Sequence, residues 1–248
     1  MTGRLQHGQW VIWLAPGSEP EPILAAVNSL DRGEGEGEEA SPSSLWQIHA
    51  GGRSTVYGVR LLGKKACLKV FTDRRFHTRM RTFLGWSKGR RAFRNGLLAY
   101  GKGVPVPCVY AYAEQRPCGP TLVVTELLEN AVQMNLLLEE RLARGVDLAA
   151  DAAFRDLIGL FARFTRDLHA RGVCHHDFSP RNVLVADLNG HPRLQLIDLE
   201  DLDFACSAGK FRTNIDHFHG KMARYVDSAA LALFQSSFNE IYERELSR

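Results

Sequence analysis

The order of the elements along this sequence predicts an α+β fold with two lobes: a small antiparallel β lobe, followed by a short helical lobe. Residues 45–71 alternate β-branched and aromatic side chains around glycines, which is typical of two or three antiparallel strands. Residues 152–172 repeat apolar side chains at steps of three and four, which predicts a long helix. Residues 183–199 indicate a hairpin with Asn189-Gly190 as its turn. We expect a cleft between the two lobes.

Composition sets the class of protein. The chain has 248 residues, 45% of them hydrophobic, which suits one two-lobed domain or two small ones. Its five cysteines are unevenly spaced and form no C-x-x-C pair, which argues against a disulfide framework or a zinc knuckle and favours a reducing compartment. The apolar stretch "WVIWLA" near the start is too short for a secretory signal, and no window approaches the roughly 18 apolar residues of a membrane span. We therefore expect a cytoplasmic protein.

The chain divides into three parts by composition. Residues 1–30 contain a short strand pattern and a short helical pattern, and we interpret them as an N-terminal extension laid onto the main domain. Residues 31–44, "DRGEGEGEEASPSS", carry almost no apolar side chains, which predicts a flexible acidic linker or loop. Residues 45–248 form the main domain, with an N-lobe at about 45–125 and a C-lobe at about 126–248.

Charge is unevenly distributed. From Arg74 to Tyr112 there are nine Lys and Arg residues and no Asp or Glu, whereas the rest of the chain is acidic on balance. A basic surface of this kind suits an anionic partner such as phosphate groups or a membrane face. The alternative is an ordinary solvated helix face.

The stretch "HHDFSPRNVL" at residues 175–184 carries the clearest chemistry. Asp177 can accept a hydroxyl proton, and Asn182, five positions later, can hold Mg²⁺. Asp198 follows on the far arm of the predicted hairpin, which brings it beside the other two. These are the parts that a phosphoryl-transfer site requires. The alternative is that Asp177 and Asn182 make only local turn hydrogen bonds.

A second group of residues lies upstream and suits phosphate binding. Gly51 and Gly52 in "AGGRSTVYGV" permit close approach of a backbone to phosphates, and Val56 is placed to pack on an adenine ring. Lys69 in "ACLKVF" follows on the next apolar strand, where a lysine can reach the α- and β-phosphates. Taken alone, the glycines could equally be an ordinary hairpin turn.

Together these motifs resemble the protein-kinase-like superfamily and, within it, the bacterial lipopolysaccharide core kinases that phosphorylate Kdo or heptose. The resemblance covers about residues 46–246 and rests on "GGRSTV", "CLKVF", "RRAFRNGLLAYGKGVPVP", "HHDFSPRNVLV" and "LIDLED". It implies a two-lobed protein-kinase-like fold with Asp177 as catalytic base and Asn182 and Asp198 as Mg²⁺ ligands. Lys69 would anchor the phosphates of ATP, and the segment from Glu126 to Leu128 would link the lobes and contact adenine.

The resemblance also implies the partners. The acceptor would be a lipid-linked inner-core sugar, phosphorylated with ATP and Mg²⁺ at the cytoplasmic face of the inner membrane. The protein would then be peripheral at an anionic membrane surface, and no nucleic-acid partner is expected.

Three features depart from the usual kinase pattern. Asn95 stands about where protein kinases carry a glutamate that pairs with the lysine, so we expect Asp198 or bound nucleotide to pair with Lys69. Glu200 replaces a glycine, which would stiffen the turn after Asp198. The short chain after Glu200 leaves no room for a peptide-binding lobe and disfavours a protein substrate.

Two other functions remain open from the sequence. One is phosphate transfer to another small hydroxyl compound, such as an aminoglycoside or choline, with the same catalytic parts. The other is a pseudokinase that binds nucleotide, or a partner, without catalysis. Asn95 and Glu200 favour it, whereas it is opposed by the intact Lys69, Asp177, Asn182 and Asp198.

Two histidine pairs could also be interpreted as metal ligands: His175 and His176 beside Asp177, or His217 and His219 in "DHFHG". Against this, one histidine of a catalytic loop ordinarily supports the backbone, and "DHFHG" lacks neighbouring ligands at metal spacing.

Overall fold

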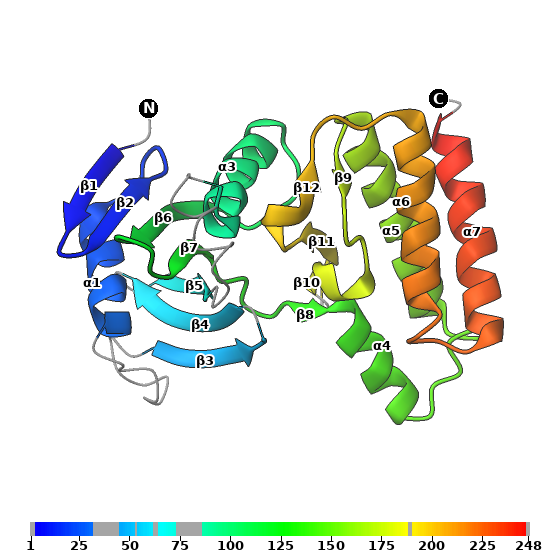
Figure 1. Cartoon of the computed structure of the whole chain (residues 1–248). Coiled ribbons are helices and arrows are strands. Elements are labelled where there is room, and N and C mark those ends of the chain that lie inside the picture. Colours follow the sequence, from blue (N-terminus) through cyan, green and yellow to red (C-terminus); the bar gives the residue numbers. More distant parts are fainter. Residues whose placement is uncertain are drawn as a thin grey trace. The chain divides into compact units, whose positions relative to one another are not determined.

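The computed structural model describes residues 3–31, 45–52, 54–61, 64–72, 86–187 and 190–246 (Figure 1). The chain divides into two compact units. Unit 1 comprises Met1–Gly101 and Pro107–Glu129, and unit 2 comprises Lys102–Val106 and Asn130–Arg248. Apart from Asp31, the linker predicted at 31–44 lies outside the described residues. The part of the basic segment between residues 74 and 81 also lies outside them.

Unit 1 is built on one antiparallel sheet of seven strands. In sheet order these are β1 (Gly3–His7), β2 (Trp10–Leu14), β6 (Val109–Gln115), β7 (Thr121–Glu126), β5 (Lys64–Phe71), β4 (Ser54–Leu61) and β3 (Leu45–Ala50). The strands predicted within 45–71 are present as β3, β4 and β5. Strand β6 was not predicted, because the prolines of "GVPVPC" precede it directly. The first residues of the chain extend the sheet through β1 and β2, so they share its hydrophobic core.

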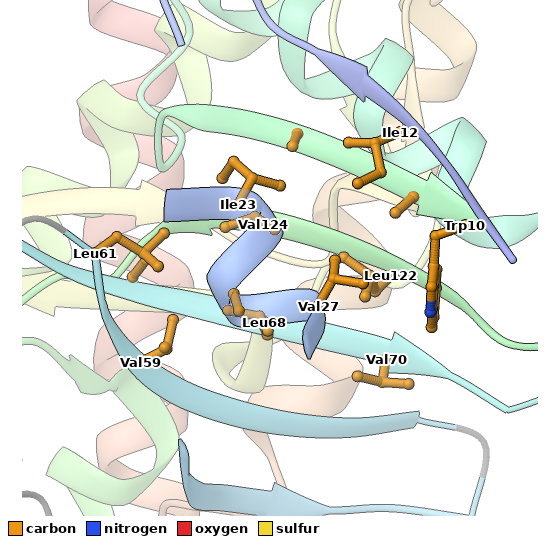
Figure 2. Close-up of a cluster of buried hydrophobic side chains, with 14 of the residues drawn as sticks. Trp10, Ile12, Ile23, Val27, Val59, Leu61, Leu68, Val70, Leu122 and Val124 are labelled. Carbon is orange, nitrogen blue, oxygen red and sulfur yellow. The ribbon is translucent and has the colours of Figure 1, made fainter. Parts of the chain in front are cut away.

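Helix α1 (Pro20–Asp31) covers one face of this sheet. Ile23 and Val27 lie over the strands and pack against Leu68, Leu122 and Val124 (Figure 2). Side chains alternate between faces along a strand, so the buried residues of β5 that face α1 take every second position. The residues between them, which include Lys69, therefore point to the opposite face.

Helix α3 (Lys88–Gly101) packs on that opposite face, over β6 and β7. The contact is close at Gly89, where a Cβ atom would lie 2.8 Å from Thr121 Oγ1, so a larger residue would push the helix away. The Phe93 and Tyr112 ring centroids are 6.1 Å apart, and the Ser87 and Tyr112 hydroxyls lie 3.0 Å apart in a hydrogen bond. These contacts fix which face of α3 is buried, and leave the other face to solvent.

Unit 2 is mostly helical. Its helices are α4 (Met134–Ala143), α5 (Ala152–Ala170), α6 (Ala208–Met222) and α7 (Ser228–Leu246). Strands β8 (Val132–Gln133), β10 (Val183–Ala186) and β11 (Arg193–Leu196) form one small sheet, and β9 (Cys174–His175) pairs with β12 (Leu202–Asp203). The short 3-10 turns η1 (Pro180–Asn182) and η2 (Leu199–Asp201) complete it. The predicted long helix is α5, and the predicted hairpin is β10–β11.

Aromatic side chains form the core of unit 2. Phe161 of α5 is 1% exposed, and its ring lies against those of Phe178, Phe218, Phe234 and Phe238. The other two phenylalanines of α5, Phe154 and Phe164, are buried as well. No helix in the described part of the chain is long and apolar enough to cross a membrane.

A buried histidine adds a polar contact to this core. His169 Nδ1 lies 2.8 Å from the hydroxyl of Tyr242, and the ring stacks on Phe211 with centroids 4.3 Å apart. Burial lowers the pKa of His169 to about 4, so the ring is neutral at physiological pH.

Candidate active site

Asp177 is held by the buried residue that follows it. Phe178 is fully buried, and its ring centroid lies 5.6 Å from that of Phe161 on α5 and 5.0 Å from that of Phe218 on α6. Asp177 itself leaves the core, with 52% of its side chain exposed. The apolar anchor therefore fixes the backbone of the loop while the carboxylate stays accessible to a reactant.

Asn182 is oriented by the backbone of Asp177. Its Nδ2 donates to the Asp177 carbonyl at 2.8 Å and lies 3.4 Å from Asp177 Oδ2. A carbonyl only accepts hydrogen bonds, so the amide nitrogen must face it and Oδ1 must face away. This local bond is the one expected from turn geometry alone. It also sets the side-chain oxygen in a fixed direction.

The β10–β11 hairpin brings Asp198 beside Asn182. Val183 pairs with Leu196 in the register of the hairpin, and the Ile197 N–H donates to the Asn182 carbonyl at 3.0 Å. Asp198, the next residue, is therefore adjacent to Asn182 in unit 2. The structure brings these two predicted Mg²⁺ ligands together with Asp177, within unit 2.

Asp198 has an unusual backbone conformation. Its φ of 59° and ψ of 52° lie in the left-handed region, which costs an ordinary residue about 1–2 kcal/mol and which Asp and Asn tolerate best. The Nε2–H of His175 donates to the carbonyls of Ile197 at 3.0 Å and Asp198 at 3.2 Å, and the Asp201 N–H donates to the Asp198 carbonyl at 2.9 Å. His175 thus supports the backbone here, as one histidine of the loop was expected to do.

Helix α6 supplies three side chains whose contacts with this loop were not predicted; His217 had been considered only as a metal ligand. Asn214 binds the backbone of His175 with both ends of its amide group. Its Nδ2 donates to the His175 carbonyl at 2.7 Å, and its Oδ1 accepts from the His175 backbone N–H at 3.5 Å. His217 Nε2 lies 3.3 Å from Asp177 Oδ1, and Lys221 Nζ lies 3.7 Å from the same oxygen. A spacing of three and then four residues places all three on one face of a helix. This spacing is the one feature of the sequence that could have predicted that the three side chains lie together.

The surroundings of Asp177 keep it ionised. Burial raises the pKa of this carboxyl, but the hydrogen bond with His217 and the charge of Lys221 outweigh burial and hold the pKa below its usual value. At neutral pH the group is a carboxylate that can take up a proton.

The two histidines of "DHFHG" point to different surroundings. His217 reaches Asp177, whereas His219 is buried, with its ring centroid 5.2 Å from that of Phe238. Across the described ranges, no three His, Cys, Asp or Glu side chains gather as a metal site would need. The geometry does not support reading the pair as metal ligands.

In unit 1, the two predicted glycines lie in the turn between β3 and β4. The Gly51 N–H donates to the Ser54 carbonyl at 2.9 Å and closes the turn. A Cβ atom on Gly52 would have no neighbour within 4 Å, so the space beside this backbone is open. An open, tight turn of this kind is compatible with a phosphate group approaching the backbone.

Val56 and Lys69 share one face of the sheet. They are direct cross-strand partners on β4 and β5, and Lys69 is in turn the partner of Val123 on β7. The Lys69 ammonium lies 5.2 Å from the centroid of the Phe71 ring. Lys69 is only half-buried, which limits the cost of removing its charge from water. Its immediate neighbours Leu68 and Val70 are buried and point to the other face, whereas Phe71 shares the face of Lys69.

The segment from Glu126 to Leu128 ends β7. The Glu126 N–H donates to the Cys108 carbonyl at 2.8 Å, and its Oε2 accepts from the Cys108 N–H at 3.3 Å. The Leu127 N–H donates to the Lys65 carbonyl at 3.3 Å, and unit 1 ends shortly after, at Glu129. The carboxylate of Glu126 is thus engaged with backbone.

The two residues that depart from the kinase pattern lie in different units. Asn95 is half-buried on α3 of unit 1, where no residue of the helix is acidic. Glu200 is 5% exposed and lies in the 3-10 turn η2, directly after the left-handed Asp198. The stiffening effect expected of Glu200 stays a prediction.

Comparison with known proteins identifies a matching sequence family and a similar solved structure. The sequence profile of the lipopolysaccharide kinase (Kdo/WaaP) family matches residues 46–212, which is more than half of the chain. A solved structure of WaaP in complex with acyl carrier protein aligns with a TM-score of 0.58 and 18% identity, covering 92% of this chain and 87% of that one. At this identity the likeness establishes the fold, and the predicted kinase-like α+β fold is confirmed. No curated protein sequence matches the chain.

Proposed function

The chain belongs to the lipopolysaccharide kinase (Kdo/WaaP) family, and on that premise we propose that it phosphorylates a Kdo or heptose hydroxyl of the lipopolysaccharide inner core. Family membership implies a phosphotransferase that uses ATP. The sugar acceptor and the residue roles are the proposal. The observation that carries the proposal is the grouping of Asp177, Asn182 and Asp198 around one loop and one hairpin of unit 2.

Asp177 acts as the general base. Its carboxylate takes the proton of the acceptor hydroxyl, the hydroxyl oxygen forms a bond to the γ-phosphorus, and the bond between that phosphorus and the β,γ-bridging oxygen breaks. The electron pair of the broken bond leaves with ADP. The half-exposed position of Asp177 supports this role, since the acceptor oxygen must come within hydrogen-bond reach of it.

Asn182 and Asp198 would hold Mg²⁺. Asn182 offers an amide oxygen in a fixed direction, Asp198 offers a carboxylate, and such hard oxygen donors are those that Mg²⁺ prefers. The ion typically takes only one or two protein ligands and completes its shell with water and phosphate oxygens. When bound, it neutralises charge on the β- and γ-phosphates.

Unit 1 would hold the nucleotide. Lys69 provides a positive charge for the α- and β-phosphates, on the same sheet face as Val56, which would pack on adenine. The backbone at Gly51 and Gly52 would approach the phosphates, and the segment from Glu126 to Leu128 would contact the adenine edge.

The outer face of α3 would meet an anionic surface. Arg90, Arg94 and Leu98 follow one another at steps of four and are exposed, with Arg91 beside them. Exposed aromatic residues lie near both ends of the helix: Trp86, just before it, is 70% exposed, and Tyr100, in its last turn, is 67% exposed. Basic side chains attract anionic headgroups, and Trp and Tyr favour membrane interfaces. We assign this face to docking at the membrane that carries the acceptor.

Replacing Arg90, Arg91 and Arg94 together with Gln should raise the apparent KM for lipid-linked acceptor and weaken binding to anionic vesicles. Each basic residue near such a surface contributes about 1 kcal/mol, and high salt should reduce the difference from wild type because it screens surface charge. Co-sedimentation with anionic vesicles and steady-state kinetics measure these effects.

The experiment must also distinguish a membrane surface from a protein partner as the group that α3 binds. The similar WaaP structure contains acyl carrier protein, so the same variant is also tested for binding to acyl carrier protein. Replacing Arg155, Arg163 and Arg212, exposed residues on α5 and α6, with Gln removes the same number of charges elsewhere and is the matched control. Unchanged vesicle binding and acceptor KM in the folded triple variant would show that the outer face of α3 is an ordinary solvated helix face.

The acceptor itself is tested by direct transfer. Purified protein with radiolabelled ATP and Mg²⁺ is expected to label lipid-linked Kdo or heptose acceptors, and not an aminoglycoside or choline. Mass spectrometry of lipopolysaccharide from a strain lacking the protein should show a missing phosphate. Labelling of the small alcohols alone, or an unaltered lipopolysaccharide, would refute the inner-core assignment.

A further inference from the structure

Helix α6 carries a lysine that contacts the side chain of the proposed base. Lys221 Nζ lies 3.7 Å from Asp177 Oδ1, and His217, one turn earlier, lies 3.3 Å from the same oxygen. Their side chains are 30% and 37% exposed, and that of Asp177 is 52% exposed. The contact is therefore open to solvent, and an acceptor hydroxyl can reach Asp177 there.

Stability alone gives little reason for this lysine. An exposed ion pair contributes only about 0–1 kcal/mol. Helix α6 is already anchored by its buried side chains, Ile215, Phe218 and Met222, and by the bonds of Asn214 to the backbone of His175. The lysine is not needed to hold the helix in place.

The loop that carries Asp177 has one permanent cation, and that cation is hydrogen-bonded to a side chain outside the loop. Between residues 175 and 184 the one side chain with a permanent positive charge is Arg181, and its Nε donates to the Tyr225 hydroxyl at 2.8 Å. A transferring phosphoryl group carries negative charge on three oxygens, and positioned cations stabilise that charge in the transition state. Lys221 is the lysine that the fold places at this point.

We propose that Lys221 is a catalytic residue, whose ammonium group contacts the γ-phosphoryl oxygens while the phosphoryl group passes to the acceptor. This role rests on the proposed function. The acceptor oxygen must lie about 2.6–3.2 Å from Asp177 to give up its proton, so the phosphorus it attacks is also near that carboxylate. An ammonium 3.7 Å from Asp177 Oδ1, on a flexible four-carbon stem, can reach both groups.

The bond changes are those of the base-catalysed transfer. The acceptor oxygen bonds to phosphorus as its proton moves to Asp177, and ADP leaves with the electrons of the broken bridging bond. Lys221 exchanges no proton in this step and contributes only its charge. His217 is a positioning residue, because its contact with Asp177 Oδ1 helps to hold the orientation of the carboxylate.

The test begins with Lys221→Met, which keeps the length of the side chain and removes its charge. Loss of one positioned transition-state contact in a partly exposed site should lower kcat about 10- to 100-fold. The ATP dissociation constant should stay within about threefold, because the charge acts mainly in the transition state. Lys221→Arg should recover part of kcat. The control is Lys210→Met, which removes a lysine of the same helix that pairs instead with Asp203 at 2.8 Å.

A double-mutant cycle separates charge on the phosphoryl group from orientation of the base. If Lys221 acts on the phosphoryl group, Lys221→Met should lower the single-turnover rate by a similar factor in wild type and in an Asp177→Asn background. If it only orients Asp177, the second substitution should cost nothing more. That second outcome, or an unchanged kcat in Lys221→Met, would overturn the proposal.

A second measurement tests the role of Lys221 independently of the identity of the acceptor. Slow ATP hydrolysis, in which water replaces the sugar hydroxyl, requires the same charge stabilisation and is measured in parallel. If the wild-type protein hydrolyses ATP without labelling Kdo or heptose, the proposed acceptor is refuted. The role of Lys221 is then still tested by the effect of Lys221→Met on the rate of hydrolysis. A wild-type protein that transfers phosphate neither to sugar nor to water would refute both.

Discussion

Asp177→Asn is expected to lower kcat about 10²–10⁴-fold and to leave ATP affinity close to that of the wild type. A general base contributes a factor of this size, and it acts on the acceptor and not on the nucleotide. The substitution preserves shape, and Phe178, buried between α5 and α6, continues to anchor the loop. Steady-state transfer to a lipid-linked acceptor and calorimetric titration of ATP with Mg²⁺ measure the two quantities.

The control for Asp177→Asn is the same change at Asp156, an exposed aspartate on α5. It removes one negative charge from unit 2 and should leave both kcat and ATP affinity unaltered. A full rate in Asp177→Asn would show that another group takes the proton. A large loss of nucleotide affinity in this variant would show that Asp177 holds the nucleotide or its metal.

Elements with a regular local pattern could be predicted from the sequence, and those without one could not. The strands within 45–71 and the helix α5 have clear periods, and the Asn-Gly turn marks the β10–β11 hairpin. Helix α4 was missed because its apolar residues, Met134 and Leu136 to Leu138, run almost consecutively and form no stripe. Leu136 is indeed 47% exposed. Strand β6 was missed because prolines mark its start as a loop.

The same distinction holds within the site. Asp177, Asn182 and Asp198 were predicted because one short stretch and one hairpin bring them together. Asn214, His217 and Lys221 were not, because their contacts with the loop span about 40 residues of sequence and depend on how α6 packs against α5 and Phe178. Packing of that kind leaves no local pattern beyond the helical spacing of the three residues.

The backbone at Asp198 makes it possible to remove charge there without changing conformation. Asp198→Asn keeps a residue type that tolerates the left-handed region, so the turn into η2 should persist. Asp187, in the β10–β11 hairpin, has a φ of 56° and pairs with Arg193. Asp187→Asn is therefore a matched control: the same substitution, in the same backbone region, in the same unit.

Asp198→Asn is expected to weaken ATP binding in the presence of Mg²⁺ about 10- to 100-fold, the loss that corresponds to about 1.5–3 kcal/mol for a contact with a charged group. Affinity for ATP without Mg²⁺ should not change, because the carboxylate acts through the metal ion. Excess Mg²⁺ should restore part of the rate in Asp198→Asn and none of it in Asp177→Asn. Nucleotide titrations at several Mg²⁺ concentrations, with Asp187→Asn alongside, measure this. Equal losses with and without Mg²⁺ would mean that Asp198 supports the fold or the nucleotide directly, and the magnesium role would then have to be abandoned.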